Sequence, residues 1–194
     1  MQAKLYLTAA FAAAAASAAA APADYEIDPE HVTVAFLVEH VGYAKVLGQF
    51  LVVEGSYRFD EATGELADVE VVVATESLTT HHEERDRHLR SGDFLAAREF
   101  PEIRFTGATA RRTGERTYEI EGRLELLGET RPVTLAATWN KSAEYPFGGS
   151  GYVMGVSARA TLARSDFGMT YGVDNGWVGD EVEVIIELEA SRRE

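Results

Sequence analysis

Three histidines and two acidic residues gather in one short segment of the sequence. His81, His82 and His88 lie close to Glu84 and Asp86, and the spacing of Glu84 and His88 would put both on one side of a helix. Imidazole and carboxylate groups are common zinc ligands. The segment lacks the second histidine that a zinc-protease helix carries four residues after the first. We therefore interpret these residues as surface side chains of a short helix and expect no metal site.

Arginines in and after the same segment suggest a second chemistry, the binding of an anionic head group. They alternate with acidic residues, so we favour ion pairs between neighbours, with a clasp from Arg85 to Asp93 or Asp86 as one example. We expect Arg164 to anchor a turn rather than to bind a ligand. The arginines concerned are Arg85, Arg87, Arg90, Arg98 and Arg104.

His40 is the polar member of an otherwise apolar row that begins at Val32. It could hydrogen-bond to a ligand head group, or to water and a backbone carbonyl at the end of its strand. We favour the structural role, and both interpretations stay open at the level of sequence.

Motifs of catalysis are absent from the sequence. There is no Gly-x-Ser-x-Gly elbow, phosphate-binding loop or dinucleotide fingerprint, and residues 148–151 form a glycine-rich turn instead. The chain has no cysteine, which excludes disulfides and thiolate chemistry. Acidic residues are abundant but fall on outward strand positions. We therefore expect no enzyme, no catalytic residue and no cofactor other than a bound lipid.

The elements that would position these residues are β-strands. Apolar and polar residues alternate with a period of two, which indicates half-buried antiparallel strands. A change of phase near Leu51–Val53 predicts a bulge in the second strand. Eight strands of this kind predict an all-β, eight-stranded antiparallel barrel. They span residues 31–40, 45–59, 68–73, 102–106, 118–126, 133–139, 152–162 and 181–189.

One segment departs from the strand pattern. Thr80 and Glu83 have the spacing of a capping box, so we expect Thr80 to cap a short helix over residues 83–90. A helix inserted between two barrel strands would cover one end of the barrel as a lid.

The inward rows leave open whether the barrel is hollow. Small side chains at inward positions would leave space for a ligand. They are Gly107, Gly122, Ala137, Ala158 and Ala160. Aromatic side chains could instead fill the interior. They are Phe36, Phe50, Phe105, Tyr118, Trp139 and Tyr152.

The first 23 residues have the pattern of a secretory signal peptide. Lys4 precedes an apolar, alanine-rich stretch that ends at Ala21-Pro22-Ala23. We expect cleavage before Asp24, a single mature domain over residues 24–194 without a membrane span, and a periplasmic or secreted location. The net charge of −14 argues against nucleic acid as a partner. The sequence leaves a homodimer open.

The chain resembles the YceI-like family, the lipocalin-like exported proteins that bind polyisoprenoids. Eight motifs carry the resemblance in order between Tyr25 and Glu189, with Val32 as a mild departure where the family often has serine. They are YEIDPEH at 25–31, Phe36-x-x-x-His40-x-Gly42, Gly48-x-Phe50, ESLTT at 76–80, RDRHLRSGDFL at 85–95, FPEIRF at 100–105, Gly122-x-Leu124-x-Leu126-x-Gly128 with Pro132-Val133, and RSDFG at 164–168.

The resemblance implies a lipocalin-like barrel whose interior holds an isoprenoid chain, such as a polyprenyl compound or a quinone, without catalysis. Two alternatives remain: a solid barrel that binds a partner of the cell envelope, and a lipid-modifying or hydrolytic enzyme that uses His40 or His88. The sequence does not distinguish transport, storage and sensing. The residues expected to contact the ligand are Phe36, Val38, His40, Phe50, Phe94, Phe105, Leu124, Leu126, Val156, Ala158 and Ala160.

Overall fold

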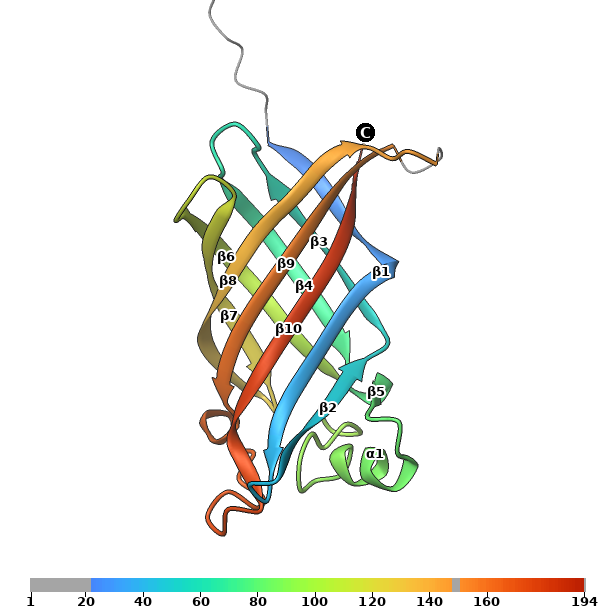
Figure 1. Cartoon of the computed structure of the whole chain (residues 1–194), viewed down its shortest axis with the longest axis vertical. Coiled ribbons are helices and arrows are strands. Elements are labelled where there is room, and N and C mark those ends of the chain that lie inside the picture. Colours follow the sequence, from blue (N-terminus) through green and yellow to red (C-terminus); the bar gives the residue numbers. More distant parts are fainter. Residues whose placement is uncertain (1–21, 148–150, 194) are drawn as a thin grey trace, which may run out of the picture.

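The computed structural model describes residues 22–147 and 151–193, which form a tilted antiparallel barrel with a short helix at one end (Figure 1). The expected signal peptide falls almost entirely in residues 1–21, outside the described residues. Within the described ranges, no helix is long and apolar enough to cross a membrane. The strands are β1 (Ala23–His40), β2 (Ala44–Phe50), β3 (Val53–Phe59), β4 (Leu66–Ala74), β5 (Leu78–Thr79), β6 (Glu102–Arg112), β7 (Thr117–Leu126), β8 (Glu129–Glu144), β9 (Tyr152–Ala163) and β10 (Val178–Arg192).

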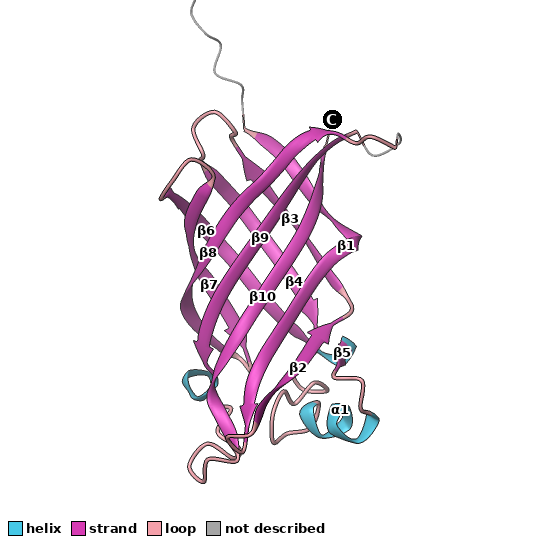
Figure 2. Cartoon of the chain, viewed as in Figure 1, coloured by secondary structure: helices cyan, strands magenta, loops and turns pink. Residues whose placement is uncertain are grey.

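Pairing between the first and last long strands closes the sheet. The order is β10-β9-β8-β7-β6-β4-β3-β1-β2-β5, and β1 also pairs with β10. β2 and β3 are two halves of one wall strand, because both pair with β1, at opposite ends of it. β5 adds only two residues beside β2. The wall therefore counts eight strands, and the sequence-based fold class is confirmed (Figure 2).

The break between β2 and β3 lies where the sequence predicted a change of phase. Leu51 and Val52 leave the ladder, and their backbone N–H groups donate to the Ser77 Oγ atom at 3.1 Å each. Phe50 and Val53 consequently both face the barrel interior. The hydroxyl of Ser77 thus replaces two missing strand hydrogen bonds.

The helix α1 (Glu83–Leu89) is present, but two predicted contacts at it are wrong. His82 is the N-cap, and its Nδ1 atom accepts a hydrogen bond from the Arg85 N–H at 3.2 Å. Thr80 is buried, and its Oγ1 atom lies 2.5 Å from an Asp86 carboxylate oxygen. Arg85 donates to the Thr80 Oγ1 atom at 2.7 Å and to the Thr80 carbonyl at 2.9 Å, instead of pairing with an aspartate. Thr80 cannot cap the helix because its hydroxyl already serves these tertiary contacts.

Candidate functional site

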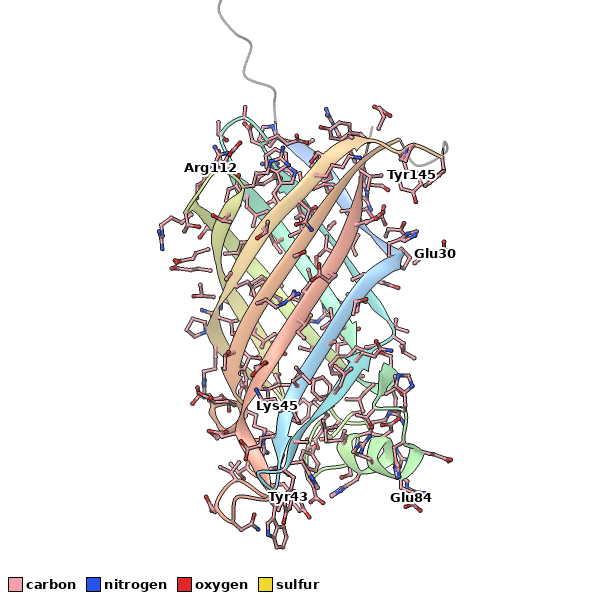
Figure 3. The ribbon with its side chains drawn as sticks, in the orientation of Figure 1. Glu30, Tyr43, Lys45, Glu84, Arg112 and Tyr145 are labelled. Atoms are coloured by element: carbon pink, nitrogen blue, oxygen red, sulfur yellow. The ribbon has the colours of Figure 1, made fainter. Side chains whose placement is uncertain are left out.

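A cavity of about 700 Å³ runs through the barrel interior. Its walls are almost entirely aliphatic and aromatic side chains from the inward faces of the strands. Polar side chains enter the lining mainly at the end that carries α1. Figure 3 shows Tyr43 at this end together with Glu84 of α1, whereas Arg112 and Tyr145 lie at the opposite end.

Every residue that the sequence analysis expected to contact a ligand lines this cavity. The set brings together the strands β1, β2, β6, β7 and β9 and the segment after α1. It comprises Phe36, Val38, His40, Phe50, Phe94, Phe105, Leu124, Leu126, Val156, Ala158 and Ala160. Several of the large side chains in the middle of the barrel, Phe36, Phe50 and Phe105 among them, are only half-buried. They keep exposed area because they face the cavity, so these side chains do not fill the interior.

The small inward residues do not all contribute space. The Phe105 ring covers Gly122, and the Phe36 ring covers Gly48 in the same way. Gly107 has φ +62° within the irregular pairing between Thr106 and Thr109, so it serves a bulge. Gly107 and Gly122 therefore do not line the cavity, whereas Ala137, Ala158 and Ala160 do.

The end remote from α1 is closed by tyrosines around Glu61 of the β3–β4 turn. The Tyr25 hydroxyl donates to Glu61 Oε1 at 2.7 Å, and the Tyr152 hydroxyl donates to Glu61 Oε2 at 3.1 Å. Burial, followed by the hydrogen bond to Glu61, raises the pKa of Tyr25. The buried hydroxyls of Tyr57 and Tyr118 have no hydrogen-bond partner among the described residues.

The end that carries α1 is where the cavity reaches the surface. His88 of α1 packs its ring edge-on against Phe94 and Tyr171, with ring centroids 5.1 and 5.2 Å apart. Its Nε2 atom lies 2.9 Å from an Asp93 carboxylate oxygen. These contacts join the helix to the loop between the 3₁₀ helix η2 (Arg164–Phe167) and β10. His40 lines the same end.

Arg164 anchors that loop, as the sequence predicted for this position. It is 3% exposed and donates to the carbonyls of four residues at 2.8–3.0 Å. A planar guanidinium can satisfy four carbonyls at once, which a lysine ammonium cannot. The four acceptors are the carbonyls of Met169, Tyr171, Val178 and Gly179.

Asp86 fixes α1 to the barrel from the inner side of the helix. Its carboxylate accepts hydrogen bonds from the Thr80 N–H at 2.7 Å, from the Thr80 hydroxyl and from the Thr79 hydroxyl. Burial alone would raise the pKa of this carboxyl. The hydrogen bonds and the charge of Arg90 outweigh burial, so the pKa of Asp86 lies below its ordinary value.

Within residues 22–147 and 151–193, no three His, Cys, Asp or Glu side chains are grouped to hold a metal ion. The cavity can take up an apolar molecule, and the groups at its open end can contact a polar head.

The sequence matches the YceI-like domain over residues 25–190. The chain belongs to the YceI-like domain family. A UPF0312 protein of Pseudomonas savastanoi pv. phaseolicola is 40% identical over 149 residues, which cover 76% of this chain and 77% of that protein. A UPF0312 protein of Pseudomonas aeruginosa is 38% identical over 173 residues, which cover 88% of each.

Solved structures of similar proteins share the YceI-like barrel. A YceI protein from Campylobacter jejuni matches with a TM-score of 0.72 and 26% identity, over 80% of this chain and 90% of that one. BcnA from Burkholderia cenocepacia matches with a TM-score of 0.73 and 19% identity, over 85% and 99%. A polyisoprenoid binding domain from Saccharophagus degradans, at 13% identity, matches with a TM-score of 0.65 over 87% and 98%. The last two likenesses concern the fold alone.

Three features of the YceI-like cavity escaped the sequence analysis. They are the hydrogen bonds of Tyr25 and Tyr152 to Glu61, the packing of Tyr171 on His88 of α1, and the exposed Trp177 at the open end. All three lie in turns or loops, where no periodic pattern marks a functional side chain.

Proposed function

We propose that this protein binds and carries a long isoprenoid lipid, of polyprenyl or quinone type, inside its barrel without catalysis. The observation that carries the proposal is the apolar cavity of about 700 Å³ inside the barrel, whose lining includes Arg85 and His88 of α1. Its volume lies within the range of small-molecule sites, roughly 300–1,000 Å³. The likeness to a polyisoprenoid binding domain supports the choice of ligand class.

The distribution of polar groups favours a chain over a compact polar ligand. An apolar chain leaving water for this cavity gains roughly 25 cal/mol for each Å² buried, because the walls are almost entirely apolar. A polar head would stay at the open end, within reach of His40, Arg85 and His88, which all line the cavity there.

The main rival is a solid barrel that binds a partner of the cell envelope. The half-buried side chains of Phe36 and Phe105 favour ligand binding over this rival, because a solid interior would bury both rings. The enzyme alternative rests on His40 or His88. The contacts of His88 are structural, with Asp93, Phe94 and Tyr171.

We place this activity in the periplasm or outside the cell. The proposal rests on the signal pattern of residues 1–23. Intact mass measurement of the exported protein should give a chain that starts at Asp24. A chain that retains Met1 in the exported fraction would contradict cleavage.

The deciding experiment is native mass spectrometry of protein purified from its exported fraction without detergent. A reproducible added mass that extracts into solvent as a polyprenyl or quinone compound supports the proposal. Ala160→Phe should abolish the added mass, because Ala160 faces the cavity. Thr161→Phe is the matched control, since Thr161 is the exposed neighbour on the same strand.

Ala158→Phe tests a different part of the same wall. Ala158 is buried in the core cluster that contains Tyr25 and Tyr118, so a phenylalanine there should overpack and destabilise the barrel by about 1–3 kcal/mol.

Equal lipid binding by wild type and Ala160→Phe would mean that the lipid binds elsewhere in the protein. A wild-type protein that carries no lipid and refuses added polyprenols and quinones would favour the solid-barrel rival.

A further inference from the structure

Four large apolar side chains are exposed together at the open end of the barrel. Tyr43 is 91% exposed, Trp177 55%, Val41 43% and Tyr171 39%, and we call these residues the mouth rim. They are half of the exposed large apolar side chains found within residues 22–147 and 151–193. Figure 3 shows Tyr43 projecting from the β1–β2 hairpin at the tip of the molecule.

The mouth rim is held in place by the backbone. The Val41 N–H donates to the Trp177 carbonyl at 3.0 Å, which ties the β1–β2 hairpin to the loop before β10. The Trp177 N–H donates to the Gly172 carbonyl at 3.0 Å, and Arg164 binds the Tyr171 carbonyl. The exposure of these side chains is therefore part of a fixed arrangement.

Val41 occupies a backbone conformation that disfavours valine. It has φ +54° and Gly42 has φ +71°, and the Tyr43 N–H closes the turn on the His40 carbonyl at 3.1 Å. Such type I′ turns favour Asn-Gly, because a β-branched residue is strained at positive φ. Since Val41 is also exposed, burial in this chain does not offset the strain. Burial of Val41 against the surface of another molecule or a membrane would account for an apolar side chain at this turn.

Charge separates the mouth rim from the rest of the surface. The protein carries a net charge of −14, yet residues 41–44 contain no charged residue and residues 168–179 contain only Asp174. A tip of this kind can approach an uncharged surface, whereas the acidic walls repel an anionic one.

Three members of the mouth rim, Val41, Tyr171 and Trp177, also line the cavity. A surface that covers the rim therefore covers the cavity opening as well. Tyrosine and tryptophan are the side chains enriched at membrane–water interfaces, because their rings are apolar and their tips are polar. These features favour a lipid surface over a second copy of the chain.

We propose that the mouth rim docks on the surface of a zwitterionic lipid bilayer and places the cavity opening against the lipid. This inference rests on the proposed function for its purpose, which is the direct passage of an isoprenoid lipid between bilayer and barrel. The docking itself is a separate physical event with its own measurement.

The test uses mature protein and phosphatidylcholine vesicles. The sequence has two tryptophans, so Trp139→Phe leaves Trp177 as the sole source of tryptophan emission. Docking should shift its emission to the blue, and lipids brominated in the acyl chains should quench it. The double variant Val41→Asn, Tyr43→Ser should lower the vesicle-bound fraction in flotation by about tenfold, a loss of about 1.4 kcal/mol. Asparagine tolerates the αL conformation, so this variant keeps its turn.

Phe147→Ser is the matched control. Phe147 is 86% exposed and belongs to the loop after β8, at the end remote from α1, so its loss should leave flotation unchanged. Native mass spectrometry of the double variant should still find bound lipid, which separates docking from cavity binding. Wild type that does not float with vesicles, or a double variant that floats equally, would overturn the proposal. Sedimentation showing a wild-type dimer and a monomeric double variant would assign the mouth rim to a homodimer interface instead.

Discussion

The Phe105 ring lies over Gly122 of the neighbouring strand so closely that a Cβ atom at position 122 would fall 2.3 Å from its Cζ atom. The two residues lie on paired strands, since Phe105 stands opposite Leu124 in the β6–β7 register. The absence of a side chain at Gly122 thus leaves room for the Phe105 ring against the neighbouring strand.

Gly122→Ala should lower the free energy of unfolding by about 1–3 kcal/mol, because the new methyl group forces the Phe105 ring to move. Phe105→Leu in the same chain should restore part of this loss. Gly92→Ala is the control, since a Cβ atom there meets nothing within 4 Å. Urea unfolding measures all four proteins. Equal effects at positions 92 and 122, or no rescue by leucine, would contradict the proposed contact.

Arg164→Lys should destabilise the protein by about 2–4 kcal/mol, because the buried carbonyls that Arg164 satisfies would lose donors. Hydrogen exchange should quicken in residues 169–179, where its four acceptors lie. Arg131→Lys, at an exposed arginine that donates to the Asp166 carbonyl, should change stability by less than about 0.5 kcal/mol. Similar effects of the two substitutions would refute the anchoring role.

Tyr57→Phe should raise stability by about 1 kcal/mol, because it removes a buried hydroxyl without a described partner. Tyr25→Phe should lower stability by about 1–2 kcal/mol, because its hydroxyl donates to Glu61. Thermal unfolding at neutral pH compares them. Destabilisation by both would mean that the Tyr57 hydroxyl is hydrogen-bonded in solution.

The buried Tyr57 hydroxyl also predicts how stability falls at alkaline pH. Burial raises the pKa of Tyr57 in the folded protein, so the unfolded chain ionises first once the pH exceeds about 10. Stability is therefore complete below pH 10 and falls above it. Tyr57→Phe should reduce this fall in urea unfolding at pH 9 and 11, and an unchanged slope would contradict the buried hydroxyl.

Asp86→Asn should lower the free energy of unfolding by about 2 kcal/mol at pH 7, because charge-assisted hydrogen bonds from Thr80 and Thr79 are lost. The folded pKa of Asp86 lies below its ordinary value. Its contribution is thus present above about pH 4 and is lost as the pH falls through the folded pKa. The gap between wild type and Asp86→Asn should shrink at pH 3, and a gap independent of pH would contradict this assignment.

The alternation of apolar and polar residues determined the strands, their inward faces and the barrel. Period-two patterning is a local property of each strand, so the strand residues expected to contact a ligand do line the cavity. Phe94 lines it too, from the segment after α1. The change of phase at residues 51–53 was visible for the same reason. The family motifs added the ligand class, which no spacing in the chain could supply.

Packing between distant residues was decided only by the tertiary structure. Whether Gly122 left a void depended on the ring of Phe105, and whether Thr80 capped a helix depended on the buried carboxylate of Asp86. The volume of the cavity and the exposure of Tyr43 and Trp177 likewise depend on which strands and loops meet. A sequence pattern states which face a side chain takes, while the space in front of that face is set by residues far away in the chain.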